Sequence, residues 1–139
     1  SRILPCDNAG IYRMMRTRCG VNHVTVIIRK ADLMAAGNYS GRFRQEDFYL
    51  WARLMKNRVK IRNISDVVVN VRSGADQFAR RGGMSYFREH MRVFRYMHDE
   101  GLISYPVLLQ NYVLRFAQVA FPTRLRTWVY QHLLRHSHR

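Results

Sequence analysis

The chain has 139 residues, of which 47% are hydrophobic, and this composition is typical of a globular domain with a buried core, which excludes a disordered segment. With 24 Lys and Arg against 9 Asp and Glu, the formal charge is +15, which favours partners that carry negative charge: nucleic acid, anionic lipid or phosphorylated molecules. The two cysteines, Cys6 and Cys19, exclude a disulfide framework and a zinc motif and favour a reducing compartment.

The first forty residues are predicted to form a loop, a strand and a short helix. Residues 1–21 lack a clear period, with a short helix expected at 9–18. The segment 23–29, HVTVIIR, is β-branched and aliphatic, which is typical of a buried strand. The residues that follow, KADLMAA, predict a short helix that ends at Gly37, and the composition GNYSG then indicates a loop.

The middle of the chain is predicted to contain a helix and two strands. A helix is expected from Asp47 to about Asn57, because apolar residues recur three, four and seven positions after Asp47 and so share one side of a helix. Residues 59–65, VKIRNIS, alternate between apolar and polar, which is typical of a half-exposed strand. Residues 66–72, DVVVNVR, indicate a second strand.

The last part of the chain is predicted to be helical. In 84–99 apolar residues recur at intervals of three and four, which indicates an amphipathic helix that ends at Gly101. Residues 102–121 are apolar almost all round, but four polar residues among them, including Arg115, favour a buried helix or one lying on a membrane surface over a membrane span. Pro122 is expected to begin a final helix.

This order of elements predicts an α+β fold, a short mixed sheet followed by three helices. We expect two parts in the chain. Residues 1–75 hold the sheet and a pair of acids, and residues 76–139 form a basic, amphipathic helical region that closes the site and contacts a membrane.

The acids Glu46 and Asp47 are the first candidates for chemistry, because two of only nine acids stand side by side before an aromatic helix. One interpretation is helix capping, since an acid at a helix N-terminus interacts favourably with the exposed N–H groups, by about 0.3–1 kcal/mol. The other interpretation is catalysis. A carboxylate held at a helix N-terminus stays ionised and faces outward, which suits a general base acting on a sugar hydroxyl.

The stretch NHVTVIIRKADLMAAGNYSGRFRQEDFYLWARLMKNRVKIRNISDVVVNVR, followed by RRGG, resembles the C-terminal, acceptor-side half of bacterial family-2 glycosyltransferases, which have the GT-A fold. The similarity extends over about residues 20–115. It implies transfer of a sugar from a nucleotide-sugar donor to a saccharide or lipid-linked glycan, with inversion at the anomeric carbon, in bacterial cell-envelope polysaccharide biosynthesis. It further implies that Asp47 is the general base, and that Glu46 orients Asp47 or holds acceptor hydroxyls.

The resemblance also implies a metal and a missing half. In the family, the nucleotide-sugar site lies in an N-terminal set of parallel strands that ends in an Asp-x-Asp metal motif. The chain contains no Asp-x-Asp and begins with Ser1 rather than Met. We therefore expect the acceptor side of an enzyme here and the donor and metal side upstream. Mg²⁺ or Mn²⁺ is expected for the complete enzyme, its Asp-x-Asp site being absent from this chain, and catalysis by the chain alone is not expected.

Gln77, Arg80 and Arg81 are candidates for substrate binding about thirty residues after the acids. Processive enzymes of the resembling family carry Gln-x-x-Arg-Trp at a comparable interval, whereas Arg81 stands here in place of the Trp. Two adjacent guanidinium groups on a loop flanked by glycine can grip a leaving diphosphate. The alternative interpretation is a solvated basic loop.

Asn22, His23 and Trp51 complete the set of candidate substrate-binding residues. The resemblance implies that a segment of the NH.TV type lies near the active cleft, where His23 contacts the donor or a metal ion. Taken alone, His23 is a structural histidine at the end of a strand. Trp51 belongs to the aromatic motif that follows the acids.

Arginines on the predicted C-terminal helices indicate an anionic membrane as a partner. Arg88, Arg92 and Arg95 share one side of the helix at 84–99, and a basic side next to an apolar one suits a helix that rests on anionic lipid. A solvated charged side is the alternative. We expect a cytoplasmic protein that is peripheral on the inner face of the plasma membrane.

Two functions without catalysis are the alternatives to a transferase. The charge of +15 also suits nucleic acid, but the sequence has no helix-turn-helix spacing, zinc finger or RNP-like motif, which argues against it. The other alternative is a membrane-peripheral module. Because half of a fold exposes sheet edge and apolar surface, we also expect self-association into a homo-oligomer.

Overall fold

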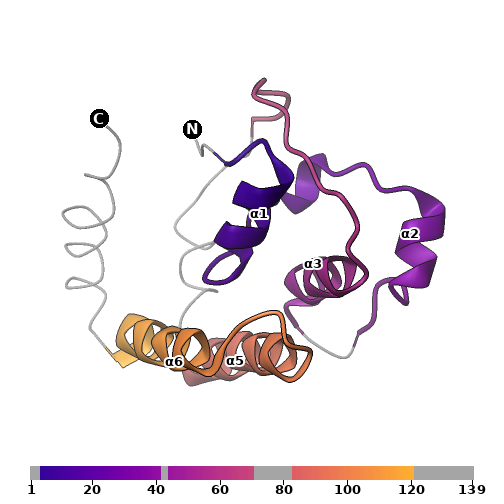
Figure 1. The fold of residues 1–139 in the computed structure, drawn as a ribbon. Coiled ribbons are helices and arrows are strands. Elements are labelled where there is room, and N and C mark those ends of the chain that lie inside the picture. Colours follow the sequence, from indigo (N-terminus) through magenta and orange to yellow (C-terminus); the bar gives the residue numbers. More distant parts are fainter. Residues whose placement is uncertain (1–3, 42–43, 71–82, 121–139) are drawn as a thin grey trace.

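The computed structural model of the chain describes residues 4–41, 44–70 and 83–120 (Figure 1). Within these residues the backbone forms five α-helices and one short 3-10 helix. In chain order they are α1 (Asn8–Met15), η1 (His23–Thr25), α2 (Lys30–Ala35), α3 (Glu46–Lys56), α5 (Gly83–Asp99) and α6 (Tyr105–Ala120).

All five helices that the sequence predicts in the described part are confirmed, and local signals set their ends. Asp7 caps α1 by accepting a hydrogen bond from the third amide of that turn. Gly37 and Gly101 follow α2 and α5 with φ of +80° and +70°, a left-handed conformation that ends a helix and that glycine adopts without strain. The helix expected from Pro122 lies outside the described residues.

The sheet is not found in the described residues, so the α+β prediction is wrong for that part of the chain. The segment expected as a strand at 23–29 begins with η1 and continues as extended backbone, with φ −95° and ψ 136° at Val26. The side chain of Ile27 is 99% exposed, and no backbone hydrogen bond joins 26–28 to another described segment. β-branched residues favour extended backbone, but a strand also needs a neighbour to pair with.

The strands expected at 59–65 and 66–72 are likewise absent from residues 59–70, and residues 71 and 72 lie outside the described part. Three hydrogen bonds attach backbone groups of the segment to α1 and the residues before it: the Tyr12 hydroxyl donates to the Val59 carbonyl at 2.8 Å, and the backbone amides of Ile61 and Asn63 donate to Asn8 Oδ1 and the Cys6 carbonyl. These bonds use backbone groups that a sheet ladder would need. The segment is therefore extended without being part of a sheet.

Helix α3 lies between α2 and α5 and is buried on nearly all sides (Figure 1). The Phe48 ring packs edge-on against Phe94 of α5 at 5.4 Å between centroids, and Tyr49 packs in the same way against Tyr96 at 4.8 Å. The side chains at the centre of the core come from α1, α3 and α5: Ile11, Met15, Leu50, Trp51, Val93, Phe94 and Met97.

Helix α6 is tied to the end of α1 by its two inward polar residues. Asn111 is fully buried and donates to the Arg16 carbonyl at 2.9 Å. Arg115 donates to the Thr17 carbonyl at 2.7 Å and lies 5.8 Å from the ring centroid of Phe94, and its burial lowers the pKa of this guanidinium below its ordinary value. In the part of the chain that the structure describes, no helix combines the length and the apolar character needed to cross a bilayer.

Candidate functional site

The acid pair occupies the first turn of α3. Glu46 is exposed and Asp47 is half-buried, and the buried aromatic residues of the helix begin immediately after them at Phe48. Asp47 Oδ1 accepts a hydrogen bond from the Phe48 amide at 2.8 Å, one of the N–H groups that a helix N-terminus leaves without an intrahelical partner. Asp47 Oδ2 receives no hydrogen bond from any described residue.

The two interpretations of the acid pair therefore apply to different oxygens. Oδ1 of Asp47 satisfies the helix end, as capping requires. Oδ2 remains able to accept a hydrogen bond or a proton. Both acids stand in the first turn of α3, where the exposed backbone N–H groups interact favourably with a carboxylate.

Tyr39 brings the loop after α2 to this acid pair. Its hydroxyl shares a hydrogen bond of 2.9 Å with Nε2 of His23, and the two rings are 5.5 Å apart. Burial raises the pKa of the Tyr39 phenol above its ordinary value of 10.0, and the carboxylates of Glu46 and Asp47 raise it further. Three separate segments thus place polar groups around the N-terminus of α3.

Arg53 holds the loop that carries Tyr39. Its guanidinium donates to the Ala36 carbonyl through Nη1 and to the Asn38 carbonyl through Nη2, both at 2.6 Å. A Cβ added at Gly37 would lie 3.0 Å from Nη1, so glycine also leaves room for this contact. The loop that carries Tyr39 is therefore fixed to the third turn of α3.

Trp51 lies inside the core and supports His23. The indole is 2% exposed and packs edge-on to the His23 imidazole, with 6.1 Å between centroids. Its Nε1 has no hydrogen-bond partner among the described residues, although a buried indole N–H usually finds one. The assignment of Trp51 to substrate binding remains a prediction, and the contact that the structure contains is with His23.

Asn22 and His23 stand at the start of η1. The Asn22 carbonyl accepts hydrogen bonds from the Thr25 amide at 3.2 Å and the Thr25 hydroxyl at 3.1 Å, which closes the turn. Asn22 therefore shapes the turn, and His23, which is exposed, points its imidazole to Tyr39. Of the residues predicted to form the site, the structure brings together His23, Glu46, Asp47 and Trp51.

Other predicted site residues lie beyond what the structure describes. Gln77, Arg80 and Arg81 are outside the described residues. Among the described residues, no group of three or more His, Cys, Asp or Glu side chains could hold a metal ion. The described residues therefore do not form a site for a divalent metal.

Tyr39 and Arg53 were not predicted as parts of this site. Tyr39 lies in the predicted loop GNYSG, and Arg53 lies in the helical motif that follows the acids, so both belong to segments that the sequence had singled out. Their roles depend on contacts between residues that are more than ten positions apart, such as Arg53 with Ala36, and periodicity along one helix does not report such contacts.

The chain is similar to bacterial glycosyltransferases over nearly its whole length. It is 31% identical over 134 residues, 96% of this chain and 49% of the relative, to an uncharacterized glycosyltransferase of Haemophilus influenzae. It is 27% identical over 132 residues, 95% of this chain and 48% of the relative, to the UDP-Gal:alpha-D-GlcNAc-diphosphoundecaprenol beta-1,3-galactosyltransferase of Escherichia coli.

A third relative is the amylovoran biosynthesis glycosyltransferase AmsE of Erwinia amylovora, 33% identical over 92 residues, which are 66% of this chain and 35% of that protein. No family model and no solved structure matches the chain. The curated relatives are thus glycosyltransferases, and the chain spans about half the length, or less, of each.

Proposed function

We propose that the chain forms the acceptor side of a family-2 glycosyltransferase that moves a sugar from a nucleotide-sugar donor to a saccharide or lipid-linked glycan. The relatives supply the class of reaction, and the name of the E. coli protein pairs a UDP-sugar with an undecaprenol-linked acceptor. The observation that carries the proposal is the gathering of His23, Tyr39 and two carboxylates at the N-terminus of α3.

In this proposal Asp47 is the general base. Its Oδ2 takes the proton from the acceptor hydroxyl while the hydroxyl oxygen bonds to the anomeric carbon of the donor sugar. The bond from that carbon to the diphosphate oxygen breaks, and the diphosphate leaves with the electron pair. Attack from the face opposite the leaving group inverts the anomeric centre.

The carboxylate geometry suits this step. The hydrogen bond from Phe48 holds Oδ1 and so fixes the orientation of Oδ2. Glu46, which is exposed, would bind neighbouring acceptor hydroxyls.

The remaining assignments follow the resemblance. Asn22, His23 and Trp51 form or support the wall of the substrate site, and Gln77, Arg80 and Arg81 bind the leaving diphosphate. The divalent metal, Mg²⁺ or Mn²⁺, is assigned to residues outside the described part, because the described carboxylates do not form a site for it.

The test is an Asp47→Asn variant of the protein as its gene encodes it. Asn can still accept the Phe48 hydrogen bond, so the helix end should persist while the base is lost. We expect kcat for sugar transfer to fall about 10²–10⁴-fold, with donor binding nearly unchanged. Transfer is measured with a panel of UDP-, GDP- and dTDP-sugars and an undecaprenol-diphosphate-linked saccharide.

The control for this test is Asp66→Asn, which removes an exposed acid from the segment after α3 and should leave the rate unchanged. Glu46→Gln should raise the KM for the acceptor more than it lowers kcat. Unimpaired turnover by the Asp47 variant would remove this residue from the mechanism. Absence of transfer by the wild-type protein from every donor would reject glycosyl transfer itself.

A further inference from the structure

The solvent side of α6 carries no charge among its described residues, and Gln110 is the one exposed polar side chain among its apolar ones. Arg115 is the only charged residue of this helix, and it is turned inward to the Thr17 carbonyl. Tyr105 and Val113 are 64% and 62% exposed, and they stand among large apolar side chains that face solvent: Leu109, Leu114 and Phe116. A surface helix ordinarily places charged residues there. We call these five residues the α6 face.

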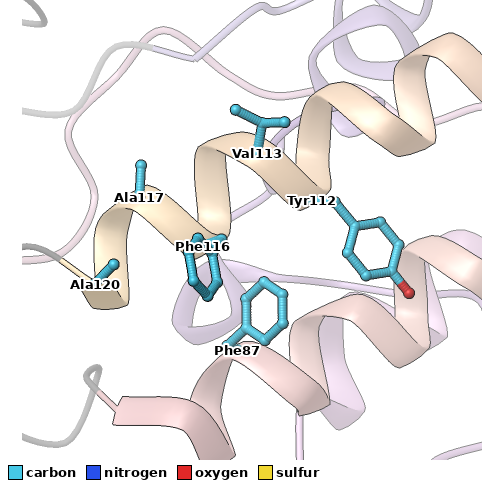
Figure 2. A pocket seen from close by; sticks show the side chains of 6 residues that line it. All are labelled: Phe87, Tyr112, Val113, Phe116, Ala117 and Ala120. Atoms are coloured by element: carbon cyan, nitrogen blue, oxygen red, sulfur yellow. The ribbon is translucent and has the colours of Figure 1, made fainter.

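An apolar groove continues the α6 face towards α5. It encloses about 400 Å³ and is lined by Phe87, Tyr112, Val113, Phe116, Ala117 and Ala120. Figure 2 shows the Phe87 ring rising from α5 towards Phe116 and Tyr112, while Val113 and Ala117 point away from α5. The Phe87 ring is 6.0 Å from each of the other two rings, between centroids. The groove thus has no charged or amide group in its lining.

Exposed arginines stand on the two elements that contact α6. Arg16 and Arg18 lie in the turn after α1, where the Arg16 and Thr17 carbonyls accept the hydrogen bonds from Asn111 and Arg115 of α6. On α5, Arg88 is exposed and follows Phe87, which lines the groove. Arg95 lies two turns further along the same side. None of these four arginines forms an ion pair with a described residue.

Charge decides which occupant fits such a surface. Two copies of the chain packed face to face would bring like-charged arginines together, which opposes a dimer. An anionic bilayer offers negative head groups for the arginines and hydrocarbon for the apolar side chains. Asn111 and Arg115 tie the inner side of α6 to the end of α1, so the exposed side of the helix would lie along the membrane surface.

We propose that the α6 face and the adjoining groove dock on an anionic membrane surface, with α6 in the plane of the interface and Arg16, Arg18, Arg88 and Arg95 on the head groups. This inference is independent of the proposed function. It does not depend on a nucleotide-sugar or on the role of Asp47, and binding to vesicles is measured with no nucleotide-sugar present.

The experiment is flotation of the protein, as its gene encodes it, with vesicles of phosphatidylcholine alone or mixed with phosphatidylglycerol. We expect partition into the mixed vesicles to be at least about tenfold stronger. Leu109→Gln combined with Val113→Gln should weaken binding to the mixed vesicles about tenfold or more, because both side chains leave the bilayer. Arg88→Gln combined with Arg95→Gln should remove most of the preference for the anionic vesicles.

The matched control is Val67→Gln combined with Val68→Gln, which removes two exposed valines from the extended segment after α3 and should leave binding unchanged. Circular dichroism checks that each variant is folded. Equal binding by the wild type and the α6 variant, or no binding to the mixed vesicles, would overturn the proposal. A concentration-dependent dimer that the α6 substitutions abolish would assign the face to a second copy instead.

Discussion

Helices α3 and α6 are both rich in apolar residues, but they expose different kinds of side chain at different places. α3 buries seven of its eleven residues, so the groups that it offers to a ligand stand at its N-terminal end, Glu46 and Asp47. α6 turns two polar residues, Asn111 and Arg115, inward against the end of α1 and exposes large apolar side chains on its solvent side. In α3, the residues available to a ligand are selected by their position along the helix, at its N-terminal end. In α6, they are selected by their position around the helix, on its solvent side.

The largest expected effect tests the difference between the buried core around α3 and the exposed side of α6. Phe94→Ala should lower the free energy of unfolding by about 3–5 kcal/mol, because Phe94 is fully buried against Phe48 and the guanidinium of Arg115. Leu109→Ala, on the exposed side of α6, should change it by less than about 0.5 kcal/mol. Urea denaturation followed by circular dichroism measures both, and equal effects would mean that the two helices do not differ in this way.

The second prediction concerns the attachment of the Tyr39 loop to α3. Arg53→Ala should lower the free energy of unfolding by about 2–3 kcal/mol, because two charge-assisted hydrogen bonds to Ala36 and Asn38 are lost together. It should also lower sugar transfer, since the loop would no longer be held beside Asp47.

The control for Arg53 is Arg29→Ala, which breaks a surface ion pair with Asp32 and should cost less than about 0.5 kcal/mol. Arg53→Lys should recover only part of the loss, because Lys cannot reach both carbonyls with a planar fork. Full stability and full transfer in the Ala variant would show that the loop is held in another way.

The third prediction tests whether the Tyr39 hydroxyl contributes to stability or to substrate binding. Tyr39→Phe removes the hydrogen bond to His23 and should lower the free energy of unfolding by about 1 kcal/mol. Because the ring remains, the rest of the fold should be unchanged. A rise in the acceptor KM without a fall in stability would instead place the hydroxyl in contact with substrate.

The fourth and smallest effect is on the dependence of stability on pH. Burial raises the pKa of Tyr12, Tyr39 and Tyr96 above the ordinary 10.0, so the folded protein holds these protons more tightly than the unfolded chain does. This contribution to stability is complete below pH 10 and is lost as the pH rises through the raised pKa values. Denaturation at increasing pH should show the decline, and Tyr39→Phe should make it shallower.

Local signals in the sequence were sufficient to find the helices. The intervals of three and four between apolar residues located α3 and α5, and Gly37 and Gly101 marked two helix ends. The same local signals misplaced the strands. Residues 59–69 have the composition of strands, yet Ile61 and Asn63 bond to the residues in and before α1 rather than to a neighbouring strand.

The candidate site was predicted only in part, for the same reason. The acids Glu46 and Asp47 were visible as neighbours in a chain poor in acids, and the motif around them pointed to Trp51 and His23. Tyr39 and Arg53 were not assigned, because their contribution depends on a loop folding back on α3.

The sequence by itself determined the helical segments, the excess of positive charge and the presence of paired acids at the start of α3. Each of these follows from residue type and spacing over a few positions, where backbone preference and side-chain chemistry act locally. Only the tertiary structure decided that His23 meets Tyr39, that Arg115 is turned inward, and that the described extended segments form no sheet. These outcomes depend on which distant groups packing brings together, because a buried polar group needs a partner within the fold.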